Sequence, residues 1–304
     1  MSVVIFGSIN MDLVVRTPRL PAPGETLIGQ TFFTAPGGKG ANQAVACARL
    51  GAHARMIGRV GDDVFGATLR DSLRAYGVDV AGVSVSAGPS GVAVIAVDDA
   101  AENTIVIVAG ANGAIGADDL ALLDGMLVDT KVLLLQLEVP LDAVISAAQA
   151  ARRRGVTVVL DPAPARPLPA ELYAATDIIT PNETEAAALV GFAVQDQQSA
   201  ERAGRALLDR GVRAAVIKMG SKGVYWIDGA RGGFAPAFQV VAVDTVAAGD
   251  AFNGGLATAL DTGLPLEHAI HWGRAAGALS VTKSGAQQSM PTRENLARML
   301  GRAG

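Results

Sequence analysis

The stretch KVLLLQLEVPLDAVISAAQAARRRGVTVVLDPAP, Lys131 to Pro164, contains the pattern that decides the fold. An apolar run is followed by a helical pattern that ends in three arginines and Gly155, and a second apolar run comes after it. Apolar strands that alternate with helices are typical of a parallel sheet covered on both faces. We therefore expect an α/β fold in which ligands bind beyond the carboxyl ends of the strands.

The same alternation extends along the chain. Helical patterns follow the strand-like runs VVIFG, ARMIGRVG, DIITPN and RAAVIKMG. The sequence predicts a three-layer, doubly wound, mainly parallel sheet with helices on both faces, in a single domain over residues 1–304. Two segments break the pattern, at about 12–34 and 91–108, where short strands are joined by turns, the second as a hairpin about DDAAEN. We interpret them as a small β-strand lid, whose apolar strands could also pair with a second copy of the chain.

The composition excludes several classes of protein. Half of the 304 residues are apolar, 18% are charged and the net charge is −4, which is typical of a globular α/β protein and not of a nucleic-acid-binding one. A single cysteine, Cys47, allows neither a disulfide framework nor a cysteine zinc site. The N-terminus lacks a basic signal region and no apolar run reaches the ~18 residues of a membrane helix, so we expect a cytoplasmic protein without a membrane partner.

Two motifs near the N-terminus could bind a polyhydroxyl ligand. GSINMD places Asn10 and Asp12 on one side of a continuing strand, where an amide and a carboxylate suit sugar hydroxyls. An Asx turn that ends the strand is the alternative. APGGKGANQAV sets glycines before a helix, where a ligand can approach the main chain beside Lys39 and Asn42, although such a turn is also commonly structural.

Two further motifs suit a metal-bound nucleotide. TPNETEA places Asn182 and Glu185 three residues apart at a helix start, where they could hold a hydrated Mg²⁺ or could simply cap the helix. KMGSKG ends a strand with a turn at Ser221 and Gly223 whose N–H groups could receive phosphate, and a plain hairpin turn is the alternative.

The stretch VDTVAAGDAFNGG, Val243 to Gly255, combines an anion site with a carboxylate. Its small residues leave the N–H groups of residues 247–250 open at a helix N-terminus, where the helix dipole favours an anion. Phosphoryl transfer needs such donors together with a carboxylate that accepts the hydroxyl proton, here Asp250. The alternative is that Asp250 only complements the helix dipole.

In their order along the chain, GSINMD, PGGKGAN, QLEVP, LDPAPA, TPNETEA, GSKG, DTVAAGDAFNGG and VTKSGAQQSMPTRE resemble the PfkB carbohydrate kinase family. The resemblance implies transfer of the ATP γ-phosphate to a primary sugar hydroxyl, with Asp250 as the general base and the backbone of Ala247, Ala248 and Gly249 as the anion hole. It implies a sugar site formed by Asn10, Asp12, Gly38, Lys39, Asn42, Glu138 and Asp250. It also implies an ATP site formed by Asn182, Glu185, Ser221, Gly223 and Gly249.

The resemblance further implies two cations and a homodimer formed through the β lid. Mg²⁺ would be held by Asn182 and Glu185 through water, and an activating K⁺ by Asp244, Val246, Ser280, Lys283, Gly285 and Ser289. D-ribose, phosphorylated to D-ribose 5-phosphate, is the acceptor expected first. A nucleoside, fructose or another ketose is the alternative acceptor, and a sugar-binding module without catalysis is the alternative function. The sequence departs from the family pattern at Val246, Ala109 and Met219, none of which is a catalytic group.

Overall fold

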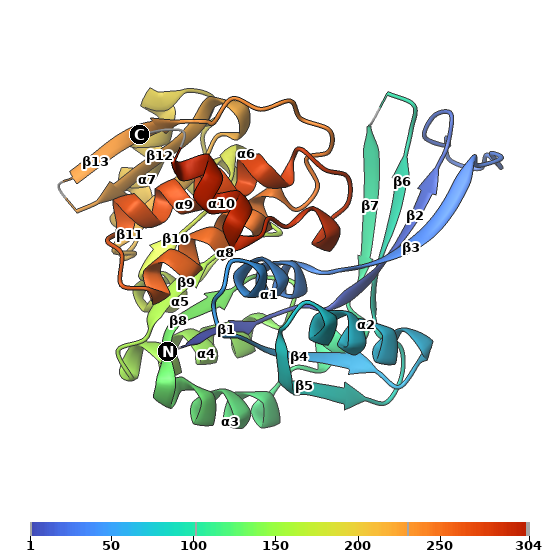
Figure 1. The fold of residues 1–304 in the computed structure, drawn as a ribbon, viewed down its shortest axis with the longest axis horizontal. Coiled ribbons are helices and arrows are strands. Elements are labelled where there is room, and N and C mark those ends of the chain that lie inside the picture. Colours follow the sequence, from blue (N-terminus) through green and yellow to red (C-terminus); the bar gives the residue numbers. More distant parts are fainter. Residues whose placement is uncertain (1, 101, 230, 302–304) are drawn as a thin grey trace.

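The computed structural model describes residues 2–100, 102–229 and 231–301, and a large sheet runs through its centre (Figure 1). The strands lie in the order β13–β12–β11–β10–β9–β8–β1–β4–β5. All neighbours from β5 to β11 are parallel, and only β12 and β13 pair antiparallel. Their bounds are β1 Ser2–Phe6, β4 Ala54–Gly61, β5 Asp79–Ser86, β8 Thr130–Leu135, β9 Thr157–Leu160, β10 Ile178–Ile179, β11 Ala214–Lys218, β12 Gly223–Asp228 and β13 Arg231–Pro236.

Helices cover both faces of this sheet, as the apolar strands predict (Figure 1). Successive side chains of β8 pack in two different hydrophobic clusters, one on each face of the sheet, because side chains in a strand point to the two faces in turn. Leu133 and Leu135 pack in the cluster that contains α3 to α7, while Val132 and Leu134 pack in the one that contains α1, α2, α8 and α9. The helices are α1 Lys39–Arg49, α2 Val64–Ala75, α3 Ala117–Met126, α4 Leu141–Arg153, α5 Ala170–Ala175, α6 Glu183–Val190, α7 Gln197–Leu208, α8 Ala248–Asp261, α9 Leu266–Ser280 and α10 Arg293–Gly301.

A second, smaller sheet stands to one side of the main sheet (Figure 1). Its strands are β2 Asn10–Arg16, β3 Thr31–Gly37, β6 Gly91–Val97 and β7 Asn103–Val108, in the order β3–β2–β6–β7. The two predicted segments do form these strands, but β2 starts two residues earlier and β3 ends three residues later than expected. β2 pairs with β6 in parallel, and the other pairs are antiparallel. Within the predicted DDAAEN turn, Ala101 lies outside the described residues.

The sequence patterns did not reveal three strands of the main sheet. β13 contains two adjacent glycines and lies at one edge, and β5 lies at the other edge and is only partly buried. β12 is buried, but only the four residues 219–222 separate it from β11, so the apolar pattern there predicts a single strand. Edge strands carry a weaker apolar signal because one side of them faces solvent. None of the helices within the described ranges is long and apolar enough to cross a membrane.

Two helical glycines should respond to alanine with opposite signs. At Gly66 in α2 a Cβ atom would lie 2.0 Å from the carbonyl oxygen of Gly61, whereas at Gly125 in α3 it would meet nothing within 4 Å. We expect Gly125→Ala to raise the free energy of unfolding by about 0.5–1 kcal/mol, and Gly66→Ala to lower it by about 1–3 kcal/mol through overpacking. Urea unfolding midpoints of the two variants measure this, and equal effects of the same sign would contradict the packing described for α2.

Candidate active site

Polar side chains gather where several strands of the main sheet end. Asp161 follows β9 directly and Lys218 is the last residue of β11, while Gln136 and Glu138 come just after β8. In an open parallel sheet the carboxyl ends of the strands meet at one edge, which is where ligands bind. A cavity lies at this edge, where the sequence predicts the site.

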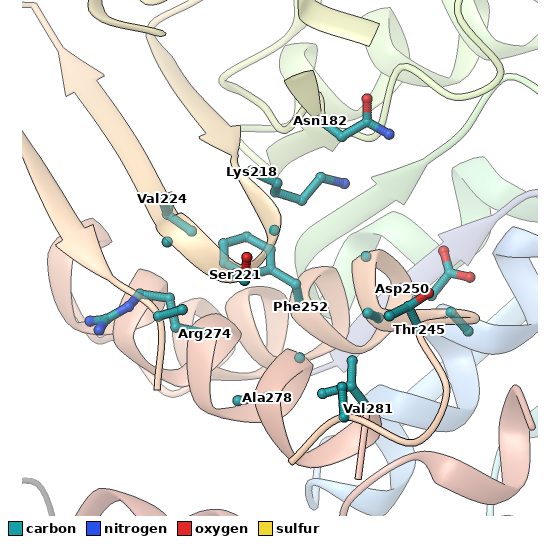
Figure 2. Close-up of a pocket in the computed structure, with 18 of the residues that line it drawn as sticks. Asn182, Lys218, Ser221, Val224, Thr245, Asp250, Phe252, Arg274, Ala278 and Val281 are labelled. Carbon is teal, nitrogen blue, oxygen red and sulfur yellow. The ribbon is translucent and has the colours of Figure 1, made fainter. Parts of the chain in front are cut away.

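The cavity has a volume of about 630 Å³ and lies between these strand ends and the helices α8 and α9 (Figure 2). It brings together the residues expected to bind ATP, although they come from three separate segments of the chain. Its lining includes Lys39, Asn182, Glu185, Ser221, Gly223, Ala247, Ala248, Gly249 and Asp250. The other residues expected to bind the sugar do not line this cavity, but Asn42 touches Asp250 directly.

The N-terminus of α8 differs from the expected anion hole at one N–H group. Ala247 caps the helix with a φ of 58°, a left-handed conformation that a residue with a Cβ atom rarely adopts. The N–H of Ala248 is not open as expected, because it donates to the carbonyl of Thr245 at 3.3 Å as the chain turns into the helix. The N–H groups of Ala247, Gly249 and Asp250 have no acceptor within the described part of the chain.

Asp250 is held rigidly in the third position of α8. Its side chain is buried, with Oδ2 accepting from Asn42 Nδ2 at 3.0 Å and Oδ1 accepting from Gln43 Nε2 at 3.1 Å. Burial raises the pKa of Asp250 to about 6, against the opposing effect of the Lys39 ammonium, and the Asp161 carboxylate adds to the rise. A carboxyl group with such a pKa is ionised at neutral pH yet basic enough to accept a proton.

A buried network behind Asp250 was not foreseen from the sequence. Gln43 Nε2 donates to Asp161 Oδ2 at 3.0 Å as well as to Asp250, while Gln43 Oε1 accepts from Gln136 Nε2 at 2.7 Å. Lys218 Nζ donates to Asp161 Oδ1 at 2.9 Å. Each of these residues stands inside or beside a motif already singled out. Their partners, however, are more than 50 residues away in the sequence, so no local spacing could reveal the contacts.

The residues expected to hold a sugar form a second group on the side of the small sheet. Asn10 is buried at the start of β2, and its Oδ1 accepts from Asn112 Nδ2 at 2.7 Å. Glu138 Oε2 accepts from Ser8 Oγ at 2.5 Å and from the N–H of Lys39 at 3.2 Å. Ser8 and Asn112, to which the sequence motifs assign no role, therefore orient Glu138 and Asn10, two of the residues expected to bind the sugar.

Electrostatics link this group to Asp250. Burial, then the carboxylates of Glu138 and Asp250, raise the pKa of Asp12 to about 7. Burial alone would lower the pKa of the Lys39 ammonium, but Asp250, Asp161, Glu138 and Glu185 outweigh it and raise that pKa. Lys39 is therefore the cation that offsets a concentration of buried carboxylates.

Two glycines of APGGKGANQAV, Gly38 and Gly40, are required by the packing of the chain around them. The sequence alone did not decide between this explanation and a ligand site. A Cβ atom on Gly38 would lie 2.7 Å from the backbone N of Asn10, and one on Gly40 would lie 2.7 Å from the backbone N of Ser8. Gly38 also has a φ of 89°. The close approach is therefore between the start of α1 and the chain that leaves β1, and it brings Lys39 beside Glu138.

Asn182 and Glu185 form a capping box at the start of α6. Asn182 Oδ1 accepts from the N–H of Glu185, and Glu185 Oε2 accepts from the N–H of Asn182, both at 2.8 Å. The helix-cap interpretation is thus realised, and both residues also line the cavity. Over the described ranges there is no group of three or more His, Cys, Asp or Glu side chains that could hold a metal ion. A cation here would therefore keep most of its waters, as Mg²⁺ readily does.

Part of the expected K⁺ ligand set is assembled beside the anion hole. Asp244 accepts from the N–H of Val246 at 3.0 Å and from the N–H of Gly285 at 2.9 Å. Its own N–H donates to the carbonyl of Val281, next to Ser280, whose carbonyl accepts from the N–H of Lys283. Ser289 Oγ bonds to the carbonyl of Ala286 at 2.8 Å, and no contact ties Ser289 to this group within the part of the chain that the structure describes.

The structure shows where the three residues that depart from the family pattern, Val246, Met219 and Ala109, lie. Val246 is half exposed, and its N–H donates to Asp244 Oδ1. Met219 is buried in the core that contains α3 to α7, and its N–H donates to the carbonyl of Gly223 at 2.8 Å, which closes the GSKG hairpin turn. Ala109 precedes the short 3-10 helix Gly110–Ala114, at the exit from β7.

A buried carboxylate, N–H groups at a helix N-terminus and a cavity at the strand ends are the features of a phosphotransferase site on an α/β fold, and comparison with known proteins agrees with this class. Residues 1–293 match the pfkB family carbohydrate kinases. The chain is 44% identical to a ribokinase of Haemophilus influenzae over 99% of both chains, and 37% identical to a deoxyribokinase of Salmonella typhimurium over 97% of both. The structure of Arabidopsis thaliana ribokinase complexed with ribose and ATP superposes with a TM-score of 0.90 at 34% identity, covering 98% of each chain.

The chain therefore belongs to the PfkB family of carbohydrate kinases. The match covers nearly the whole chain, and the mainly parallel sheet with its small companion sheet agrees with the ribokinase fold. The expected fold class, family and enzyme class are all confirmed.

Proposed function

We propose that this protein transfers the γ-phosphoryl group of ATP to the 5-hydroxyl of D-ribose, giving D-ribose 5-phosphate and ADP. The observation that carries the proposal is Asp250, a buried carboxylate placed beside free N–H donors at the N-terminus of α8 and inside the cavity. The similarity to ribokinases over the full chain supports the choice of acceptor.

In this mechanism Asp250 accepts the proton of the sugar hydroxyl. The hydroxyl oxygen bonds to the γ-phosphorus, while the bond from that phosphorus to the β–γ bridging oxygen breaks and ADP leaves. The transferred group carries its negative charge toward the N–H groups of Ala247 and Gly249, which are already oriented by the helix and need no rearrangement. The Gln43 and Asn42 amides keep the Asp250 carboxylate in place during the transfer.

We propose that the sugar lies between Asp250 and the small sheet. Asn10, Asp12 and Glu138 would accept or donate hydrogen bonds to its hydroxyls, with Gly38, Lys39 and Asn42 completing the site. The small sheet, about residues 12–34 and 91–108 of a single domain, would act as a lid that closes over the sugar and excludes water, which would otherwise compete as acceptor. The small sheet is joined to the rest of the chain at residues 7–9, 38, 87–90 and 109, and such a closure would hinge at these four connections.

The same proposal includes two cations. Asn182 and Glu185 would hold hydrated Mg²⁺ against the ATP phosphates, with Ser221 and Gly223 in the nucleotide turn. Mg²⁺ neutralises charge on the phosphates when it is bound. K⁺ would be held by Asp244, Val246, Ser280, Lys283, Gly285 and Ser289, several of them through backbone carbonyls. This would stabilise the loop that leads to the anion hole.

A homodimer through the lid is supported by the apolar surface of the small sheet. All of β7 is exposed, and Ile105, Val106, Ile107 and Val108 are each 44–57% exposed. On β3, Phe32 is 64% exposed. Because consecutive side chains of a strand point to opposite faces, β7 carries exposed apolar side chains on both faces of the small sheet, and exposed apolar side chains gathered in this way are typical of an interaction surface.

Asp250→Asn should lower kcat by at least about 10³-fold, because it removes the base while keeping the shape and the hydrogen-bonding reach of the side chain. Ribose binding measured by calorimetry should change little, since the other sugar ligands remain. Asp118→Asn provides the matched control, because Asp118 is 95% exposed on α3. Turnover of Asp250→Asn near that of the control would contradict the assignment of the base.

Sugar-dependent ADP release tests the acceptor and the monovalent cation together. The panel contains ribose, 2-deoxyribose, fructose, other pentoses and nucleosides, each with Mg²⁺-ATP in KCl or in NaCl at equal ionic strength. We expect ribose to give the highest kcat/KM, and kcat to fall at least about fivefold in Na⁺ because the smaller ion fits the carbonyl site poorly. 2-Deoxyribose is the second candidate acceptor, given the similarity to deoxyribokinases. No turnover with any acceptor would instead favour a binding module.

A further inference from the structure

Lys218 has no role in the mechanism described above, yet its ammonium lies inside the cavity. It ends β11, its side chain is 13% exposed, and it points from the strand end toward the space between Asn182 and Asp250 (Figure 2). A Cβ atom built on Gly249 would lie 3.3 Å from Lys218 Nζ. The ammonium is therefore adjacent to the anion hole at the start of α8.

The position of this ammonium is fixed from behind. Lys218 Nζ donates to Asp161 Oδ1 at 2.9 Å, and the other oxygen of Asp161 accepts from Gln43, which also holds Asp250. A lysine ammonium has three N–H donors, and Asp161 takes the one hydrogen bond that the structure gives it among the described residues. Two donors thus remain for a ligand on the cavity side.

The charges that line the cavity explain why a phosphate ligand would bind to the two free donors of the Lys218 ammonium. The carboxylates of Asp161, Glu185 and Asp250 all line it, together with the two lysines Lys39 and Lys218 and with Arg274. Glu183 also lines it but is paired with Lys222 at 2.8 Å. Nucleotide phosphates that entered this space would meet a net repulsive set of carboxylates unless cations were placed among them. Lys222 belongs to the nucleotide turn but is paired with Glu183 and does not line the cavity. Of the two lysines that do line it, Lys218 is the one that ends the strand leading into this turn.

We propose that Lys218 donates hydrogen bonds to the transferred phosphoryl group beside Gly249, and that Asp161 is the residue that positions it. This inference rests on the proposed phosphoryl transfer. The proton path and the bonds that form and break are unchanged. Lys218 adds a fixed positive charge where negative charge moves from the γ-phosphorus oxygens to ADP. A bridge between β9 and β11, across β10, is the purely structural alternative.

The test compares Lys218→Met with the double variant Lys218→Met/Asp161→Asn. The double variant removes the buried carboxylate that the single variant leaves unpaired, so it separates the loss of the phosphate contact from damage to the fold. We expect both variants to lose about 10²–10³-fold in kcat, the effect of removing one transition-state donor, with KM for ribose within about twofold of wild type. Lys218→Arg should recover part of kcat, because it restores the charge.

Nucleotide binding gives a readout that does not need turnover. Calorimetry should show that Lys218→Met weakens a non-hydrolysable ATP analogue at least about tenfold while leaving ADP within about threefold, since ADP lacks the γ-phosphate. Lys131→Met is the matched control, because Lys131 is the second residue of β8, at the opposite end of the strand from the site, and donates to the carbonyl of Asp261. Near-normal kcat and near-normal affinity for the ATP analogue in the double variant would overturn the inference. Lys218 would then serve only as a structural bridge between β9 and β11. A wild-type protein without sugar-dependent ADP release would instead contradict the proposed function, and the analogue affinities would still decide the role of Lys218.

Discussion

Burial of the Asp250 carboxylate at the N-terminus of α8 is the constraint on which the site depends. Burial disfavours the charged form, and the Lys39 ammonium and the amides of Asn42 and Gln43 counter that penalty only in part. Those three groups all come from the start of α1, so α1 and α8 must pack closely. A Cβ atom on Gly254 would lie 2.4 Å from Ala46 Cβ, which shows how little space separates the two helices. The fold thus keeps a carboxylate ionised and basic beside donors for phosphate.

The two sheets carry different groups of the site. The main sheet supplies rigid strand ends, at which Asp161, Lys218 and Glu138 are fixed by packing on both faces. The small sheet supplies Asn10 and Asp12 from β2, so the groups proposed to bind the sugar belong to the part proposed to close. Sugar binding and closure would then be coupled, because the same strand carries both. The exposed apolar side chains of β7 belong to the same small sheet, and we propose that they contact a second copy of the chain.

Much of this could be predicted from the sequence. Continuous apolar runs such as those of β8 and β9 predict a parallel sheet, because such runs are typical of strands that are buried on both faces. The groups at Asn182, Ser221 and Asp250 stood in local motifs and do meet in the cavity. Gln43, Asp161 and Lys218 could not be linked in advance, because their contacts join residues from distant parts of the chain. Whether the glycines before α1 serve a ligand or the packing was also decided only by the close approach of the β1 loop.

The pH dependence of kcat/KM for ATP at saturating ribose tests the central claim most directly. Bound ribose would occupy Asp12, so the acidic limb would report Asp250. Because the pKa of Asp250 is raised to about 6, its basic form is lost as the pH falls through that value. We expect a plateau above pH 7 and an approximately tenfold loss per pH unit well below pH 6. A profile that stays level down to pH 5 would contradict the account of Asp250 as the base.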